Sequence, residues 1–298
     1  METETKKSAP AESGGRFSPL LVLAGAIFFS LGGILVKLVP WHPLSISGAR
    51  CILAALEMLV YFRLRRHRFV LNRSTILGGL CLTATGTLYV LANKLTTAAN
   101  AILLQYTAPV FIILMLWAFF HEKPDRLDVG ATAVLFVGVA LFFLDSLSTG
   151  GGRELVGVIA ALLSGVSYAG VFMMNRFPGA DPVSSVLLGD LFGAVIGLPW
   201  LVRETDFTLP ALGGVLLIGL VQFGLGYLCM AEGLRGTPPL TASLISMVEP
   251  ILNPVLAALV IRERMGAVSL AGAAIVIGGI AVYNILKERL KERRKDDE

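Results

Sequence analysis

The stretch AILLQYTAPVFIILMLWAFF, residues 101–120, decides the fold of this chain. It is apolar and long enough to cross a bilayer as a helix, because roughly 20 such residues span the hydrocarbon core. Its first half nevertheless contains Gln105, Tyr106 and Pro109. Hydrogen-bonding side chains and a helix-breaking residue are costly where water is absent, so they indicate a protein interior rather than a surface in contact with lipid.

The whole chain has the composition of a membrane protein. Of its 298 residues, 55% are apolar and only 15% are charged, and the mean hydropathy is +0.76. Soluble domains carry about 25% charged residues. We predict an all-α integral membrane protein with ten transmembrane helices. The predicted spans are 18–39, 43–62, 74–93, 97–120, 126–144, 154–174, 182–202, 209–231, 237–261 and 266–286.

The chain contains an internal repeat. Residues 96–142 align without gaps with residues 237–283 at an offset of 141, which pairs Pro109 with Pro250. Each half then holds five helices, and this odd number means that the second half enters the membrane from the opposite side. We therefore predict two inverted five-helix repeats, an architecture common among secondary transporters. The predicted boundaries are a disordered cytoplasmic N-terminal tail at 1–17, a first repeat at 18–148, a second repeat at 149–286 and a basic cytoplasmic C-terminal tail at 287–298.

The basic residues predict the orientation of the chain, because Lys and Arg concentrate on the cytoplasmic side of a membrane. With the N-terminus inside, eighteen of the 25 basic residues fall on the cytoplasmic side, six fall outside and Arg50 lies within a helix. Both termini should therefore be cytoplasmic, in a bacterial-type inner membrane. The net charge of +4 follows from this topology, and no basic domain indicates a nucleic-acid partner.

Prolines interrupt two of the predicted spans. A proline removes one backbone donor and its ring clashes with the carbonyl one turn earlier, and in a bilayer that carbonyl needs another partner. Pro109 and Pro250 occupy matching places in the two repeats, and Pro254 adds a second predicted break to the span 237–261. Paired breaks in two inverted halves indicate a binding site near the middle of the membrane. A packing kink is the alternative for either proline alone.

Glu249 is the first candidate for a substrate-binding residue. It lies in the middle of the span 237–261, directly before Pro250, and its counterpart in the first repeat is Ala108. The repeat symmetry therefore does not require a charge at this position. Acidic residues within a membrane are rare and often mark function. Glu249 could bind a cationic group, or it could take up and release a proton; the alternative is a neutral carboxyl group bonded to a freed helix carbonyl.

Further polar residues could form the walls of the same site. Ser246 and Asn253 lie three and four residues from Glu249, so the three share one helix face. Tyrosines offer an apolar ring face and a hydroxyl group, and the ring can hold a cation. Interhelical bonding without substrate contact is the alternative for each of them. The remaining predicted substrate-binding residues are Gln105, Tyr106, Tyr168, Gln222 and Tyr227.

Charged residues also occur within two other spans. Arg50 lies in the second span and Asp190 in the seventh, at nearly equivalent places in the repeat. An isolated charge at this depth is expensive, so we predict a structural pair between Arg50 and Asp190, with Glu57 as another possible partner for Arg50. A carboxylate of the substrate is the alternative partner. Three glycines spaced by four residues in the span 182–202 predict close helix packing.

The repeated segments carry a resemblance to a known family. The copies NAILLQYTAPVFIILMLWAFFHEKPDRLDVGATAVLFVGVALF and TASLISMVEPILNPVLAALVIRERMGAVSLAGAAIVIGGIAVY each combine a mid-helix proline, a glutamate at a helix end and a Gly-containing helix. With AIFFSLGGILVKLVPWHPLSISGAR at 26–50, they resemble the EamA-type family of the drug/metabolite transporter superfamily. The resemblance implies ten helices in two inverted modules, a central cavity lined mainly by helices 1, 3, 4, 6, 8 and 9, and movement of small organic solutes, often outward. The early aromatic residue of the family, commonly tryptophan, is Phe28 or Phe29 here.

Motifs of other function classes are missing from the sequence. Cys51, Cys81 and Cys229 have no metal-ligand spacing, His121 and Asp125 lie in a loop without a partner cluster, and no GxxxxGK[ST] motif occurs. We therefore expect no enzyme activity, no cofactor and no metal. We predict a secondary transporter that moves a small organic metabolite, such as an amino acid or an amine, across the cytoplasmic membrane by alternating access, more as an exporter, with protons and membrane lipid as further partners. A solute channel or pore is the alternative, and a membrane-embedded enzyme ranks third.

Overall fold

The structure is a computed structural model that describes residues 17–123, 125–149, 151–173, 178–237, 245–246, 248–262 and 266–296. Within these ranges the regular elements are all helices, as the sequence predicts. The predicted N-terminal tail lies almost wholly outside the described residues. Among the described residues, seven helical segments are long and apolar enough to cross a membrane, namely Ser18–Leu38, Pro43–Arg65, Arg73–Leu95, Ala98–Phe120, Gly152–Met173, Pro182–Leu201 and Leu209–Gly233.

Within the described residues, fourteen helical elements follow one another. Those of the first half are α1 (Ser18–Ser30), α2 (Gly32–Leu38), α3 (Pro43–Arg65), α4 (Arg73–Leu95), α5 (Ala98–Gln105), α6 (Ala108–Phe120) and α7 (Arg126–Thr149). Those of the second half are α8 (Gly151–Met173), α9 (Pro182–Leu201), α10 (Leu209–Leu216), the π-helical segment η2 (Leu217–Leu225), α11 (Gly226–Gly236), α13 (Val248–Ile261) and α14 (Ala267–Asp296).

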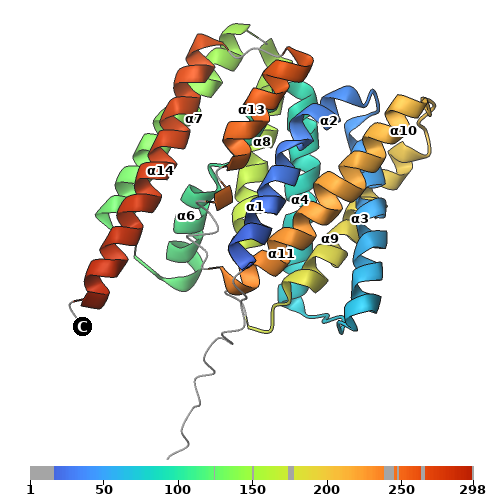
Figure 1. Ribbon diagram of the computed structural model, residues 1–298. Helices are drawn as coiled ribbons and strands as arrows, with labels where there is room; N and C mark the ends of the chain where they lie inside the picture. Colours follow the sequence, from blue (N-terminus) through green and yellow to red (C-terminus); the bar gives the residue numbers. More distant parts are fainter. Residues whose placement is uncertain are drawn as a thin grey trace, which may run out of the picture.

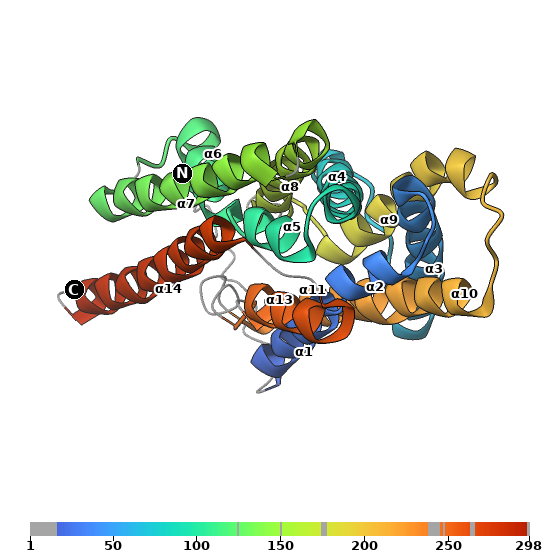
Figure 2. The ribbon, with the colours of Figure 1, turned by 90° about the horizontal axis from the view of Figure 1, so that it is seen from above.

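The helices form one main bundle with a helix pair at its edge (Figure 1). In the bundle, α3 packs on α9, α4 packs on both α8 and α9, and α1 packs on α11. Seen from above, α7 and α14 extend away from these helices on one side (Figure 2). The pair stays attached because Ala273 and Val276 of α14 pack into an apolar cluster with Ile102 and Leu103 of α5.

Small residues allow α3 and α9 to approach each other closely. A Cβ atom added at Gly197 would lie 2.3 Å from Cα of Gly48, and one added at Gly193 would lie 2.5 Å from Sγ of Cys51. Any larger side chain at these positions would push the two helices apart. The close packing predicted from the glycine spacing in the span 182–202 is therefore confirmed, and it brings α3, which carries Arg50, against the second half of the chain.

One helical prediction needs correction. α13 continues through residue 254 without interruption, so the predicted break at Pro254 is not found. A membrane helix tolerates a proline where neighbouring groups satisfy the one carbonyl that it frees. α14 runs to Asp296 and thus includes most of the segment predicted as the basic C-terminal tail. Its basic residues are good helix formers, so leaving the apolar region does not end the helix.

Two loops meet at one end of the bundle, where α3 leads into α4 and where α9 begins. His67 Nε2 lies 2.9 Å from Oδ2 of Asp181, and Asn72 Nδ2 donates to the carbonyl oxygen of Gly179 at 2.6 Å. Asp181 is also the N-cap of α9, where it accepts a hydrogen bond from the backbone N–H of Ser184 at 2.9 Å. Burial raises the pKa of Asp181, but the hydrogen bonds from Ser184 and His67 outweigh it, so the pKa lies below its ordinary value.

The loop contact predicts a pH-dependent contribution of Asp181 to stability. Asp181→Asn keeps a capping oxygen but loses the negative charge, whereas Asp181→Ala loses both and should cost about 1 kcal/mol at neutral pH. A carboxyl group whose pKa is lowered by folding stabilises the protein above its unfolded pKa of about 4, and this contribution is lost as the pH falls through the folded pKa. In detergent, the thermal unfolding midpoint of the wild type should therefore be higher than that of Asp181→Asn at neutral pH. The difference between the two midpoints should shrink below about pH 4. A difference that stays constant down to that range would contradict the assignment.

Candidate functional site

The helical hydrogen-bond ladder is interrupted between α5 and α6. α5 ends at Gln105, α6 begins at Ala108, and Pro109 occupies the first turn of α6. Pro109 has no N–H to donate to the carbonyl of Gln105, so the helical ladder is interrupted there. The hydroxyl of Thr107 partly replaces the ladder by donating to the carbonyl oxygen of Leu104 at 2.6 Å. The helix is thus interrupted at Tyr106 and Thr107, about two residues before Pro109, from which the break was predicted.

Helix α8 packs directly on this break. A Cβ atom added at Gly165 would lie 3.0 Å from the carbonyl oxygen of Gln105 and 3.0 Å from Oγ1 of Thr107. The bare backbone of Gly165 therefore leaves room for the polar groups that the break exposes. Nearby on α8, Ser164 accepts a hydrogen bond from Nε2 of Gln105 at 2.8 Å and donates to the carbonyl oxygen of Thr85 at 2.9 Å. The side chain of Gln105 is thereby held in place.

The matching place in the second repeat lies in α13. Val248, the first described residue of this helix, is 141 residues after Thr107, and Pro250 follows two residues later. Residues 238–244 and 247 lie outside the described part of the chain. The side chain of Tyr106 connects the break between α5 and α6 to this part of the second repeat. Its hydroxyl donates to Oε2 of Glu249 at 2.8 Å and shares its hydrogen with the carbonyl oxygen of Ser246 at 3.0 Å.

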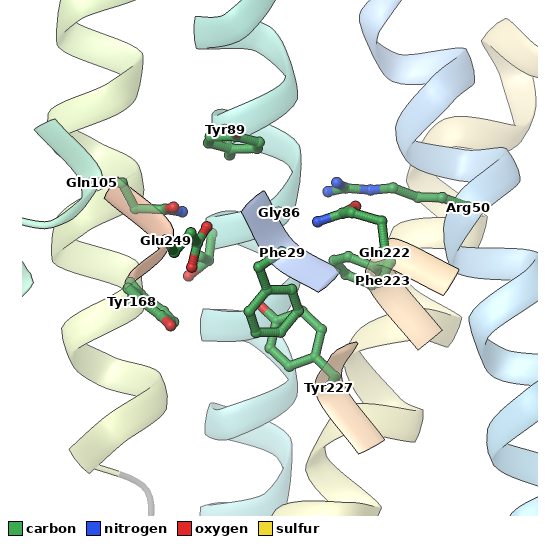
Figure 3. A pocket seen from close by; sticks show the side chains of 11 residues that line it. Phe29, Arg50, Gly86, Tyr89, Gln105, Tyr168, Gln222, Phe223, Tyr227 and Glu249 are labelled. Atoms are coloured by element: carbon green, nitrogen blue, oxygen red, sulfur yellow. The ribbon is translucent and has the colours of Figure 1, made fainter. Parts of the chain in front are cut away.

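A buried pocket lies beside this meeting point (Figure 3). Its volume is about 30 Å³, which is enough for about two water molecules, because one water needs about 10–15 Å³ measured in this way. Aromatic rings form much of its wall: the ring of Tyr227 contacts Phe29 at 4.7 Å and Phe223 at 4.8 Å between centroids. The lining residues are Phe29, Arg50, Thr85, Gly86, Tyr89, Gln105, Tyr168, Gln222, Phe223, Tyr227 and Glu249.

The structure brings the eight predicted substrate-binding residues to this pocket or next to it. Three of them contact residues that line the pocket. The hydroxyl of Tyr106 donates to the carbonyl oxygen of Ser246 beside Glu249, and Nδ2 of Asn253 donates to the hydroxyl of Tyr89 at 3.2 Å. The other five line the pocket directly, namely Gln105, Tyr168, Gln222, Tyr227 and Glu249. Their contact with a substrate stays a prediction.

The predicted pair between Arg50 and Asp190 has no hydrogen bond, although the two side chains interact electrostatically. Arg50 is 1% exposed and Asp190 is 0% exposed, yet Nε and Nη2 of Arg50 and both carboxylate oxygens of Asp190 have no hydrogen-bond partner. The guanidinium group instead lies 4.2 Å from the centre of the Phe223 ring. Its Nη2 fills the space beside Gly86, where an added Cβ would lie 2.5 Å away. The free space and the attraction of a cation to an aromatic face draw Arg50 into the pocket.

Sequence reasoning did not predict several lining residues. Tyr89 had a usable signal, because the segment LYVLANKL that contains it resembles GYLCMAEGL, which places Tyr89 opposite Tyr227 in the repeat. Gln222 and Phe223 lie in η2, where the helix is π-helical. Such segments are rare and frequently occur at functional sites. Nothing in the local composition predicts η2, so the direction of Phe223 could not be inferred from sequence.

The described part of the chain holds no cluster of three or more His, Cys, Asp or Glu side chains that could bind a metal ion. The charged members of the pocket are one arginine and one glutamate, and its other polar groups are hydroxyls and amides. This set can bind a small polar molecule through hydrogen bonds and charge.

A helical chain with apolar spans, an internal repeat and a buried polar pocket between its halves defines a multi-pass membrane transporter. Residues 16–144 and 155–285 each match the EamA-like transporter family, and the chain belongs to this family. It is 26% identical over 288 residues to the uncharacterized transporter YwfM of Bacillus subtilis, covering 93% of this chain and 97% of that protein. It is 29% identical over 243 residues to solute carrier family 35 member G1 of Homo sapiens, covering 76% and 66% of the two chains.

The fold also matches a known crystal structure. The match has a TM-score of 0.64 at 18% sequence identity and covers 92% of this chain and 98% of the other. At this identity the likeness concerns the fold alone. The relatives named above are transporters and not enzymes, so membrane embedding and a small-molecule substrate follow from the family.

The contact between α8 and the break predicts an effect of Gly165→Ala. The added methyl group would press on the carbonyl oxygen of Gln105 and on Thr107, which should lower the free energy of unfolding by about 1–3 kcal/mol. Gly152→Ala on the same helix is the matched control, because a Cβ atom there meets nothing within 4 Å. It should be neutral or slightly stabilising, since alanine favours helix. Thermal unfolding of both variants in detergent tests this; equal stability of the two would show that Gly165 is not under a steric constraint.

Proposed function

We propose that this protein is a secondary transporter that carries a small organic metabolite across the cytoplasmic membrane by alternating access, with export as its direction. The observation that supports this most is the hydrogen bond from Tyr106 to Glu249. It joins the helix break of the first repeat to α13 of the second repeat, one residue before Pro250, at the wall of a buried polar pocket. Transporters with inverted repeats place their substrate sites at such interrupted helices near the middle of the membrane.

The full architecture in this proposal is ten transmembrane helices in two inverted repeats. α7, α13 and α14 would complete the seven long apolar segments, with α5 and α6 forming one interrupted span. The correspondence of Pro109 in α6 with Pro250 in α13 at the repeat offset of 141 supports this arrangement. An odd number of spans in each half then inverts the second half relative to the first.

The size of the pocket supports alternating access rather than a continuous pore. A volume of about 30 Å³ does not accommodate a metabolite. Substrate binding therefore requires the walls to separate, and Tyr106 and Glu249 lie on two such walls. In the proposed cycle the pocket opens to one side, takes up the solute and closes around it. Protons are a second proposed partner, through Glu249, and membrane lipid surrounds the apolar outer faces.

Counterflow in proteoliposomes tests the proposed function. Purified protein is reconstituted into vesicles that are preloaded with a mixture of unlabelled metabolites, and uptake of a radiolabelled metabolite extract is measured. A carrier should accumulate label faster in preloaded than in empty vesicles, because the inward and outward steps are coupled through one site. Uptake without this stimulation would indicate a channel, and no protein-dependent uptake would count against transport.

Glu249→Gln should keep the fold, since the amide is nearly isosteric, and lose most of the counterflow. If Glu249 is a proton site instead, exchange should persist but lose its dependence on pH. A variant with unchanged rate and pH profile would remove Glu249 from the site.

The proposed orientation places both termini in the cytoplasm of a bacterial-type inner membrane, on the basis of the excess of Lys and Arg in the loops assigned to that side. Single cysteines introduced at Ser8 and Asp297, in a background without Cys51, Cys81 and Cys229, should react with a membrane-impermeant thiol reagent only after the cells are opened. Labelling at either position in intact cells would reverse the assignment.

A further inference from the structure

Arginines are concentrated in the loop between α3 and α4 and in the helix ends beside it. The segment YFRLRRHRFVLNRST, residues 61–75, contains no aspartate or glutamate. Its arginines are all exposed, namely Arg63, Arg65, Arg66, Arg68 and Arg73. None of them forms an ion pair within 4.0 Å in the part of the chain that the structure describes. The described residues therefore leave a concentrated positive charge without a neutralising partner.

The backbone of this loop is held against the start of α9. His67 contacts Asp181 at 2.9 Å, and the backbone N–H of Val70 donates to Oγ of Ser184 at 3.0 Å. Both contacts use groups other than the arginine side chains. The loop is thus fixed in place while its guanidinium groups stay at the surface, where they can bind an external anion.

Arg66 has a backbone conformation that glycine usually adopts. It is the C-cap of α3, with φ of 51° and ψ of 34°, in the left-handed region. Glycine or asparagine is the common residue at such a helix end, because a Cβ atom disfavours this conformation. The general excess of basic residues in cytoplasmic loops does not require one at this position. Strained residues cluster at functional sites, so the side chain of Arg66 is a candidate for binding.

Apolar side chains are exposed next to the arginines. Phe69 is 45% exposed, Leu71 is 64% exposed and Leu64 is 78% exposed. In Figure 1 the loop between α3 and α4 lies at the lower end of the molecule, as does the C-terminal end of α14. The end of a membrane-spanning bundle lies at the level of the lipid headgroups, where basic side chains reach phosphates and apolar ones reach acyl chains. The loop offers both kinds of contact.

We propose that this loop binds an anionic phospholipid of the adjacent leaflet. The arginines bind its phosphate, since a guanidinium group can form two parallel hydrogen bonds with phosphate oxygens. Phe69 and Leu71 contact its acyl chains. Clusters of basic residues directly beside a transmembrane helix attract anionic lipids in this way. In the proposed orientation this is the cytoplasmic leaflet, and the lipid site is separate from the central pocket.

Thermal unfolding in mixed micelles tests the lipid site. The purified full-length protein in a non-ionic detergent is titrated with palmitoyl-oleoyl phosphatidylglycerol, or with phosphatidylcholine that has the same acyl chains. A lipid that binds only the folded state raises the unfolding midpoint, and the titration gives its apparent affinity. Phosphatidylglycerol should bind at least about tenfold more tightly than phosphatidylcholine. This advantage should shrink between about 0.05 M and about 0.5 M salt, because the charges are exposed and salt screens them.

Variants separate lipid binding from stability. Arg66→Gly removes the charge and relieves the left-handed conformation, so without added lipid it should be at least as stable as wild type. Its affinity for phosphatidylglycerol should nevertheless fall about fivefold, and Arg68→Gln should show a similar loss. Leu71→Ser should weaken both lipids by a similar factor, because their acyl chains are the same. Arg289→Gln is the matched control, since Arg289 is exposed on α14 and lies outside the loop, and it should bind like wild type.

Three results would overturn the proposal. The first is equal stabilisation by the two lipids, or an advantage of phosphatidylglycerol that is unchanged in both Arg66→Gly and Arg68→Gln. The second is an equal loss in Arg289→Gln, which would indicate a diffuse attraction to the whole basic face. The third is displacement of the lipid by millimolar inorganic phosphate, which would show that the loop binds a free anion. An advantage of phosphatidylglycerol that falls in the two loop variants alone, and that phosphate does not abolish, is the expected result.

Discussion

An interrupted helix inside a bilayer must satisfy its own polar groups, and the site depends on this constraint. Between α5 and α6, backbone N–H and C=O groups without a helical partner cannot hydrogen-bond to bulk water in the hydrocarbon region of a bilayer. At the break the hydroxyl of Thr107 bonds the carbonyl of Leu104, Gly165 leaves room for the carbonyl of Gln105, and the hydroxyl of Tyr106 donates to Glu249. The last contact reaches the other half of the chain, so a local backbone requirement also ties the two repeats together.

The pocket holds two buried charged side chains whose environments differ. Buried charged groups destabilise a protein unless they are compensated, and they are retained where they serve function. The guanidinium group of Arg50 lies on the face of Phe223, and the carboxylate of Glu249 accepts a hydrogen bond from Tyr106. A substrate that enters the proposed site has to replace these contacts with equally favourable ones.

The sequence predicts the helical fold well because hydropathy and spacing are local properties. The apolar spans, the interruption near Pro109 and the close packing of α9 all follow from residues that are adjacent along one helix. The direction of Arg50 could not be predicted in this way. It depends on space left by Gly86 on α4 and on the ring of Phe223 in η2, so it requires the relative placement of three elements. The continuity of α13 through residue 254 likewise depends on surroundings rather than on the proline itself.

The repeat explains why the charges can act between the two halves of the chain. Symmetry accounts for the scaffold: Pro109 in α6 corresponds to Pro250 in α13, and Tyr89 corresponds to Tyr227. The charges break this symmetry, because Glu249 is the counterpart of Ala108 in the first repeat. The scaffold is therefore shared by the two halves, whereas the acidic group of the pocket comes from the second half alone.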